Sequence, residues 1–232
     1  MRNFQVEFQN QGGEFVTSFY AIKQKLTGVK AYVFDWDGVF NDGVKHQNYG
    51  SPFSEIDAMG TNMLRFSHYL RTGEVPITCI VTGEKNAAGL YLAEREHFNG
   101  FYFNIKNKAW ALEHLCDGYG LKPTEICFAF DDILDLSIAE KAGLRMMVAH
   151  NGNPMFKALV KDKGYADYIT KCTGGQGAVR EFCELLIGMN YSFEQVVTLR
   201  SQFAPIYQSY LEARQVIELK DYTIQNSKID SP

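Results

Sequence analysis

The sequence predicts an α/β fold, a Rossmann-like parallel sheet flanked by helices. Short, nearly continuous apolar runs alternate along the chain with longer segments whose apolar residues recur at helical spacing. Such apolar runs are typical of strands buried on both faces, and strands that alternate with helices form βαβ units with parallel strands. Hydrophobic residues make up 46% and charged residues 22% of the 232 residues, which is ordinary for a globular domain and argues against long disorder.

The elements follow one another regularly. The predicted strands lie at 30–35, 76–81, 100–103, 126–130, 144–149 and 167–170. The predicted helices between and after them lie at about 57–72, 86–97, 107–119, 134–142, 154–163 and 176–188. One amphipathic helix is expected earlier in the chain, where Phe15, Phe19, Ile22 and Leu26 recur at helical spacing.

Residues 41–56 (NDGVKHQNYGSPFSEI) interrupt this alternation. Their Asp-Gly and Tyr-Gly-Ser turn signals predict a small β-hairpin flap, which is far too short to be a cap domain. We therefore expect an N-terminal helical extension at 1–27, one α/β core at 28–190, and a helical tail at 191–232.

Composition excludes several function classes. The 27 acidic and 23 basic residues give a net charge of −4, so the chain lacks the positive field of a nucleic-acid binder. No apolar stretch approaches the ~20 residues that cross a membrane, and the N-terminus has no apolar secretion signal. The five cysteines form no C-x-x-C pair, which favours the reducing cytoplasm.

Polar side chains follow four of the predicted strands. They are Asp35 and Asp37 with Gly38 after the first strand, Thr82-Gly83-Glu84-Lys85 after the second, Lys106 and Lys108 after the third, and Asp131-Asp132 with Asp135 after the fourth. Ligands of open α/β sheets bind at the carboxyl ends of the strands, so these groups are expected to share one crevice.

Together these groups suit phosphoryl transfer. Several carboxylates in one crevice repel one another unless a cation such as Mg²⁺ lies among them. One carboxylate can accept a phosphoryl group, a second can exchange protons with the leaving oxygen and water, and Lys with helix-start amides can hold the phosphoryl oxygens. Each motif alone also has a structural explanation, as a turn, a helix cap or a solvated lysine. Their shared position at successive strand ends favours a site.

Four segments resemble the motifs of the haloacid dehalogenase superfamily of phosphohydrolases. They are FDWDGVFNDG (34–43), VTGEKN (81–86), Lys108 and FDDILDL (130–136). Within it, IDAMG (56–60) and GGQGAVRE (174–181) resemble the small capless branch that includes the 3-deoxy-manno-octulosonate 8-phosphate phosphatases. The resemblance spans about 31–190.

This resemblance implies a role for each motif residue. Asp35 would be the nucleophile that forms an aspartyl phosphate, and Asp37 the general acid and base. Mg²⁺ would be held by the Asp35 carboxylate, the Asp37 backbone carbonyl and Asp131. The remaining assignments are phosphate binding by Thr82, Gly83 and Lys108, substrate binding by Glu84, Lys85, Asp42 and Asp57, and support by Asp132 and Asp135. The resemblance also implies a homotetramer in which a neighbour's hairpin and tail cover the site, and a route of bacterial surface-glycan synthesis of the lipopolysaccharide or sialic-acid type.

Two positions depart from the branch. The octulosonate enzymes usually have T-G-R where this chain has Thr82-Gly83-Glu84-Lys85. T-G-E-K resembles instead the variant of nonulosonate 9-phosphate phosphatases, so the expected substrate is a phosphorylated 2-keto-3-deoxy sugar acid with nine carbons rather than eight. Phe130 replaces the usual Gly before Asp131, which could change the backbone of that loop.

Two other interpretations remain open at this point. The first is a catalytically weak relative that acts as an interaction protein, suggested by Phe130 and by the two terminal extensions. The second is a receiver-like phosphoacceptor module, which also combines paired acids, a Thr and a Lys around Mg²⁺. Receivers place the paired acids after the first strand, whereas the D-x-D-G motif comes first here.

Overall fold

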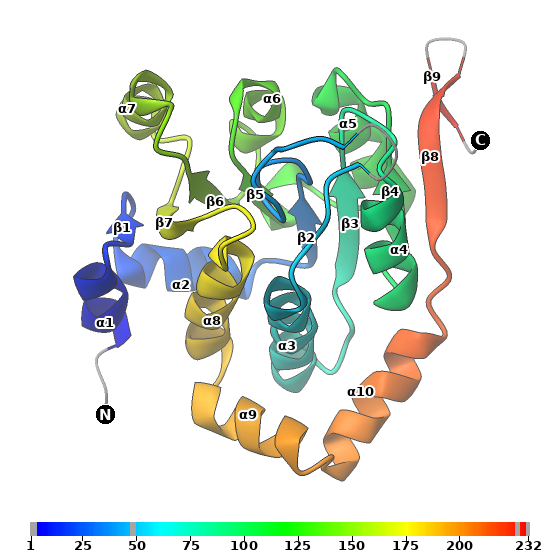
Figure 1. Ribbon diagram of the computed structural model, residues 1–232. Coiled ribbons are helices and arrows are strands. Elements are labelled where there is room, and N and C mark those ends of the chain that lie inside the picture. Colours follow the sequence, from blue (N-terminus) through cyan, green and yellow to red (C-terminus); the bar gives the residue numbers. More distant parts are fainter. Residues whose placement is uncertain (1–3, 47–49, 226–227, 231–232) are drawn as a thin grey trace.

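A nine-stranded sheet with helices on both faces forms the centre of the molecule (Figure 1). A computed structural model describes residues 4–46, 50–225 and 228–230 of the chain. The strand order is β1-β7-β6-β5-β2-β3-β4-β8-β9. The strands from β7 to β8 are parallel, and an antiparallel strand closes each edge. The predicted fold class is therefore confirmed.

The six predicted strands form the middle of this sheet. They are β2 (Ala31–Phe34), β3 (Ile77–Val81), β4 (Gly100–Tyr102), β5 (Ile126–Phe130), β6 (Leu144–Ala149) and β7 (Tyr168–Thr173). All residues of β2 and β5 are buried, which is why these strands are continuously apolar in sequence. Because they are parallel neighbours, their carboxyl ends meet at one edge of the sheet.

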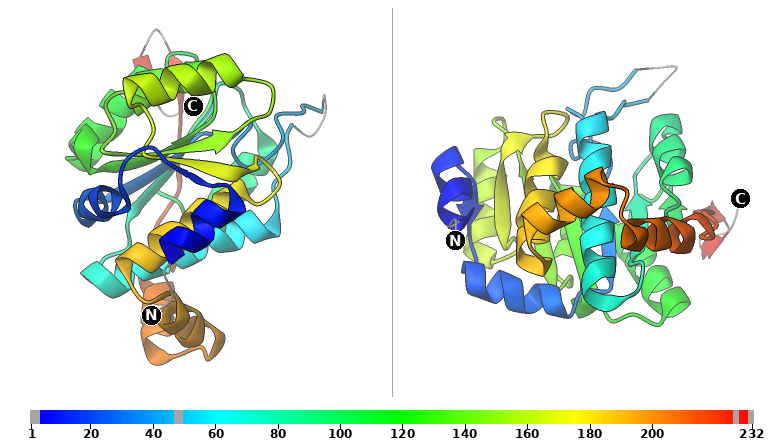
Figure 2. Two further views of the ribbon diagram at one scale, coloured as in Figure 1. Left: turned by 90° about the vertical axis from the view of Figure 1, so that its left-hand side faces the viewer. Right: turned by 90° about the horizontal axis from the view of Figure 1, so that it is seen from below.

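Two helical layers cover the sheet, and the sheet lies between them (Figure 2). One layer contains α2 (Phe19–Thr27), α3 (Glu55–Thr72), α4 (Ala87–Arg95) and α8 (Ala178–Asn190). The other contains α5 (Lys108–Tyr119), α6 (Leu136–Ala139) and α7 (Pro154–Lys163), with the short 3₁₀ helices η1 (Pro123–Glu125) and η2 (Ile133–Asp135). The helix expected at 134–142 is thus split into η2 and α6. None of the described helices is long and apolar enough to cross a membrane.

The N-terminal segment is only partly helical. It contains α1 (Phe4–Gln11), β1 (Glu14–Phe15) and then α2, which Ser18 caps. The prediction that Phe15 belongs to the amphipathic helix is wrong, because Phe15 pairs with Tyr168 of β7 in an antiparallel ladder. The two rings also contact each other edge to face, with centroids 5.0 Å apart.

The C-terminal segment corrects a second expectation. After α9 (Phe193–Ser201) and α10 (Pro205–Gln215) come two strands, β8 (Lys220–Gln225) and β9 (Lys228–Asp230), so the tail is not helical throughout. β8 pairs with β4 and supplies the hydrogen-bonding partners that this edge otherwise lacks. Tyr222 stacks on Tyr102 with ring centroids 4.7 Å apart, which fixes the strand to the core.

The segment predicted as a hairpin lies between β2 and α3. Its described part contains a single antiparallel bridge, between His46 and Gly50, and the intervening 47–49 lie outside the described residues. The helix α3 already begins at Glu55, with Ser54 as its cap, so the flap is a little shorter than expected. No further domain stands over the sheet in the described ranges.

Candidate active site

A tight loop carries the D-x-D-G motif away from β2. Asp35 continues the strand, since its N–H donates to Ala129 O at 2.9 Å. Gly38 then has φ +87°, and a Cβ there would lie 2.0 Å from Asp131 Oδ2, so only glycine brings the loop this close. The Asn41 side chain fixes the loop, because its Oδ1 accepts hydrogen bonds from the N–H groups of Gly38 and Gly43.

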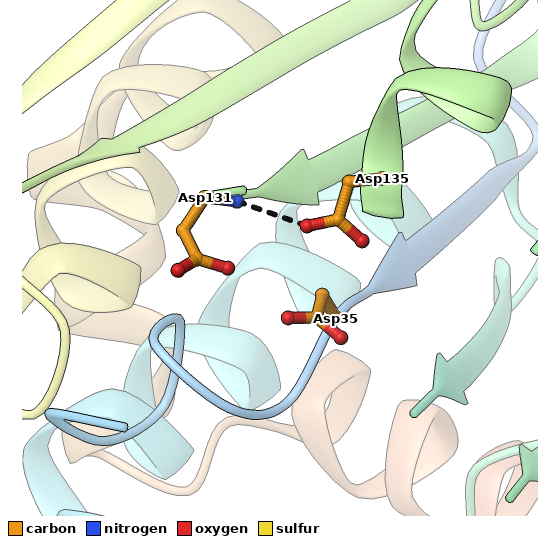
Figure 3. Close-up of side chains that lie close together, drawn as sticks. All are labelled: Asp35, Asp131 and Asp135. Atoms are coloured by element: carbon orange, nitrogen blue, oxygen red, sulfur yellow. Dashed lines mark hydrogen bonds between the residues drawn. The ribbon is translucent and has the colours of Figure 1, made fainter. Parts of the chain in front are cut away.

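Three buried carboxylates meet at the ends of β2 and β5 (Figure 3). Asp35, Asp131 and Asp135 each offer an oxygen, and these oxygens lie within 4.8 Å of one another. Asp131 Oδ1 is buried without a hydrogen-bond partner in the structure. A buried, unpartnered carboxylate oxygen in an acidic cluster fits a hard cation such as Mg²⁺. Asp135, which the sequence suggested only as a supporting residue, is part of this cluster.

Lys108 at the start of α5 connects two of these acids. Its Nζ donates to Asp135 Oδ1 at 2.5 Å and to Asp35 Oδ1, and its side chain is only 3% exposed. Burial opposes the charged ammonium, but the carboxylates of Asp135 and Asp35 outweigh it and raise the pKa of Lys108. Burial raises the pKa of Asp35 well above its usual value, and the charge of Asp135 adds to this effect while Lys108 opposes it. The cluster therefore favours any further positive charge.

The second motif, VTGEKN (81–86), lies at the end of β3, beside the acidic cluster. Thr82 is fully buried at the end of β3, with its N–H donating to Tyr102 O at 2.8 Å. Gly83 and Glu84 line a cavity of about 480 Å³ together with Asp35, Asp37 and Lys108. The phosphate-binding candidates Gly83 and Lys108 thus reach this cavity directly, whereas Thr82 lies behind its wall.

The cavity includes further predicted residues and some that the motifs did not identify. Asp42, Asp132 and Asp135 line it as well. The additional charged or polar lining residues are Lys45, Lys106, His150 and Asn153. Lys45 belongs to the flap, and His150 directly follows β6. The rule that ligands bind after parallel strands could therefore have found His150.

Two predicted substrate-binding residues do not reach the cavity. Asp57 is fully buried where α3 meets α8, and its Oδ1 accepts a hydrogen bond from Arg180 N at 2.8 Å. This burial raises the pKa of Asp57 to about 6. Lys85 does not line the cavity either, and its Nζ lies 5.3 Å from the centre of the Phe103 ring. Asp57 is therefore a partner of the α8 N-terminus and lies outside this cavity.

Lys45 of the flap contacts an acidic residue of the first motif and one of the second. Lys45 Nζ lies 2.8 Å from Glu84 Oε2 and 3.4 Å from Asp37 Oδ2. This pairing lowers the pKa of Glu84. Burial lowers the pKa of Lys45, but the carboxylates of Glu84 and Asp37 together outweigh it and raise that pKa. Glu84 is therefore a paired carboxylate at the cavity wall.

His150 adds a contact to the acidic cluster. Its Nε2 lies 2.9 Å from Asp131 Oδ2, and this carboxylate raises the pKa of the histidine. The ring approaches Asp131 from the end of β6, so the carboxylate is held from a third strand. Phe130, the unusual residue before Asp131, is fully buried and stacks on Phe128 with centroids 5.8 Å apart. Asp131 still reaches the acidic cluster.

The sequence of the chain is similar to those of several named phosphatases. No family model matches the chain. A 3-deoxy-D-manno-octulosonate 8-phosphate phosphatase of Escherichia coli BL21-DE3 is 28% identical over 169 residues, which are 72% of this chain and 83% of the relative. The enzyme of the same name from Yersinia pestis is 27% identical over 167 residues, 71% of this chain and 82% of the relative.

Solved structures share the same architecture. A probable YrbI family phosphatase from Pseudomonas syringae pv. phaseolica has a TM-score of 0.66 at 28% identity, covering 78% of this chain and 97% of its own. The 3-deoxy-D-manno-octulosonate 8-phosphate phosphatase from Moraxella catarrhalis, solved with magnesium, phosphate and KDO, has a TM-score of 0.63 at 28% identity. That match covers 76% of this chain and 96% of the Moraxella chain.

Proposed function

Because this chain is a phosphatase of the haloacid dehalogenase superfamily, similar to the 3-deoxy-D-manno-octulosonate 8-phosphate phosphatases, we propose that it hydrolyses a phosphorylated 2-keto-3-deoxy sugar acid. The observation that carries the proposal is the buried cluster of Asp35, Asp131 and Asp135 with Lys108 at the carboxyl ends of the parallel strands. The relatives' names and the KDO-bound Moraxella structure support the substrate class.

Asp35 and Asp37 would carry out the chemistry. The Asp35 carboxylate attacks phosphorus, the bond to the sugar oxygen breaks, and its electron pair leaves with that oxygen. Asp37 gives its proton to this oxygen and later takes one from the water that cleaves the Asp35–phosphate bond. Lys108 and the Gly83 N–H would bind the phosphoryl oxygens throughout, with Thr82 behind them supporting that loop.

The acidic cluster fits a divalent cation. The Asp35 carboxylate, the Asp37 backbone carbonyl and Asp131 would hold Mg²⁺, and Asp132 and Asp135 would support them. Bound Mg²⁺ supplies positive charge that lets an anionic phosphate enter a carboxylate-lined cavity. The unpartnered Asp131 Oδ1 supports this assignment.

The number of carbons in the sugar acid substrate is a separate part of the proposal. The matched relatives support the eight-carbon octulosonate 8-phosphate. Glu84, in contrast, favours the nine-carbon nonulosonate 9-phosphate, because it belongs to the T-G-E-K sequence that resembles the nonulosonate phosphatases and it lines the cavity. Lys45, which pairs with Glu84, would complete this side of the substrate pocket together with Asp42.

The assembly and the location of the protein are part of the same proposal. A homotetramer would let a neighbouring flap or tail cover the cavity, and the lack of a paired cysteine motif fits a cytoplasmic enzyme. The molar mass in solution, measured by light scattering, tests the tetramer: a monomer would contradict it.

Phosphate release with and without Mg²⁺ tests the proposed function. The substrates are octulosonate 8-phosphate, nonulosonate 9-phosphates and a plain hexose phosphate, with Asp35→Asn as the inactive control. Preference for a nonulosonate phosphate would support Glu84 as a specificity residue, and preference for the octulosonate phosphate would support the relatives' substrate. A folded protein without Mg²⁺-dependent turnover on any of them would favour the interaction-protein alternative.

A further inference from the structure

The Asp37 carboxylate is held by both limbs of the flap. Its Oδ1 accepts a hydrogen bond from Ser51 Oγ at 2.7 Å, and its Oδ2 lies 3.4 Å from Lys45 Nζ. In the sequence, Lys45 precedes residues 47–49 and Ser51 follows them. The two oxygens of Asp37 thus have different partners, one a neutral hydroxyl and the other a cation of the cavity wall.

The Ser51 contact is built into the core, unlike the Lys45 contact. Ser51 is fully buried, and its carbonyl accepts a hydrogen bond from Trp36 Nε1 at 3.2 Å. Trp36 is also fully buried, stacks on Phe40 with centroids 4.9 Å apart and contacts Phe53 edge to face at 6.0 Å. The Lys45 side chain, in contrast, is 47% exposed.

A second contact fixes this limb of the flap. Gly50 has φ +66°, and a Cβ there would lie 2.8 Å from Asn86, the residue that caps α4. The chain at Gly50 therefore runs directly over the start of α4. The backbone at Gly50 and Ser51 is therefore fixed by two contacts, one with Asn86 at the start of α4 and one with Trp36. These contacts fix the position of the Ser51 hydroxyl beside Asp37.

We propose that Ser51 is a positioning residue for the proton transfers of Asp37. The inference rests on the proposed function of this site. By donating to Oδ1, the hydroxyl fixes the rotation of the carboxyl group and leaves Oδ2, on the side of the cavity lysine, to carry the transferred proton. That proton passes from Oδ2 to the sugar oxygen as the P–O bond breaks, and Oδ2 receives one from water in the second step.

Dependence on the leaving group separates this role from a structural one. An alkyl phosphate needs its leaving oxygen protonated, whereas p-nitrophenolate leaves without a proton. The value of kcat/KM reports the steps up to departure of the leaving group. We expect Ser51→Ala to lower kcat/KM about 10- to 100-fold for octulosonate 8-phosphate but less than about 3-fold for p-nitrophenyl phosphate. General acid–base catalysis typically accelerates a reaction ~10²–10⁴-fold, and the loss of one positioning contact removes part of that acceleration.

Ser54→Ala is the matched control. Ser54 lies on the same limb, but its hydroxyl oxygen accepts a hydrogen bond from Ile56 N at the start of α3 and has no contact with Asp37 in the structure. This variant should leave the ratio of the two kcat/KM values unchanged. If Ser51→Ala does not fold, Ser51→Cys keeps the side-chain size with a weaker donor, and the same selective loss is expected for it.

The experiment distinguishes a failure of the Ser51 proposal from a failure of the proposed function. An equal fall for both substrates, or no fall for either, would overturn the positioning role while leaving the phosphatase proposal intact. Wild-type protein that releases no phosphate with Mg²⁺ from these two substrates or from nonulosonate 9-phosphates would instead contradict the proposed function itself. A selective loss in Ser51→Ala supports both.

Discussion

Lys108 shows at the scale of one residue how a proposed phosphate-binding group can also contribute to stability. Its buried ammonium lies between Asp35 and Asp135, so its removal leaves two carboxylates without their cation. Removing one partner of a buried ion pair typically costs about 3–5 kcal/mol, because the remaining charge is desolvated and unpaired.

We therefore expect Lys108→Ala to lower the free energy of unfolding by about 3–5 kcal/mol in metal-free buffer. With saturating Mg²⁺ the loss should be smaller, since the cation compensates the same carboxylates. Urea denaturation with and without Mg²⁺ measures both values. The control is Lys106→Ala at an exposed lysine two residues earlier, which should stay within about 0.5 kcal/mol of wild type. A Lys108 variant as stable as the control would contradict the buried pairing.

His68 gives the prediction for pH. Burial, together with the charge of Arg71, lowers the pKa of this histidine to about 3, while its usual value is 6.5. The unfolded chain therefore binds a proton between pH 6.5 and 3 that the folded chain does not bind. The stability contribution is complete above pH 6.5 and is lost as the pH falls toward 3.

We expect wild-type protein to lose about 3 kcal/mol of unfolding free energy between pH 7 and pH 4 through this one group. His68→Phe should lose less over the same interval by about that amount, because phenylalanine does not titrate. The Tyr32 hydroxyl lies 3.3 Å from His68 Nδ1 and also accepts a hydrogen bond from Asn190 Nδ2 at 3.5 Å, so it keeps one partner in the variant. Chemical denaturation at several pH values is the measurement, and parallel curves for the two proteins would contradict the prediction.

Sequence reasoning identified most of the cavity residues but not their pairings. Asp35, Asp37, Gly83, Lys108 and Asp131 could be found because each directly follows a buried apolar run or begins the next helix. Asp57 lies outside this cavity, and a motif resemblance does not distinguish a carboxylate facing substrate from one facing the backbone of α8. The Lys45–Glu84 pair joins residues about forty positions apart, and no local pattern indicates it.

At the scale of elements, the loop after β2 depends on the turn between β7 and α8. Gly174 lies against this loop, and a Cβ on it would stand 2.0 Å from Gly38 O and 2.2 Å from Asn41 O. Both neighbours are backbone atoms that cannot rotate away. Any side chain at this position must therefore push the loop that carries Asp37.

We expect Gly174→Ala to lower kcat about 100-fold, since a displacement of about 1 Å at reacting groups costs that much. Gly118→Ala is the control, because Gly118 lies within α5 and a Cβ there meets no atom within 4 Å. That variant should keep full activity and gain a few tenths of a kcal/mol or more of stability. Full activity of a folded Gly174 variant would show that the loop adjusts.

The elements also show where sequence patterns succeed and fail. Strands β2 to β6 were predicted to within one residue at each end, because burial on both faces makes them almost continuously apolar. The last of the predicted strands, β7, runs three residues further than the predicted 167–170, because exposed Lys171 interrupts its apolar run. β8 was missed because KDYTIQ alternates polar and apolar residues at a partly exposed edge, within a tail otherwise rich in helix formers. Its partner β4 is distant in sequence, so nothing local indicates that the segment completes a sheet.

At the scale of the whole molecule, the acidic cluster links metal binding to stability. A ligand that binds only the folded chain raises the free energy of unfolding by about 2.7 kcal/mol at a hundred times its dissociation constant. We expect Mg²⁺ to raise the melting temperature, EDTA to reverse the rise, and Asp131→Asn to abolish most of it. Differential scanning calorimetry measures this without any substrate. An equal rise in wild type and Asp131→Asn would place the cation elsewhere.

The position of β8 has a consequence for how the chain is made. During synthesis the hydrogen-bonding edge of β4 emerges early, while the strand that covers it is translated only after the whole α/β core and both tail helices. Until then a nascent chain presents an open parallel edge, which is a template for pairing with another nascent chain. A chain whose synthesis stops within α9 or α10 would therefore contain the acidic cluster but leave the hydrogen-bonding edge of β4 unpaired, which favours association with other incomplete chains.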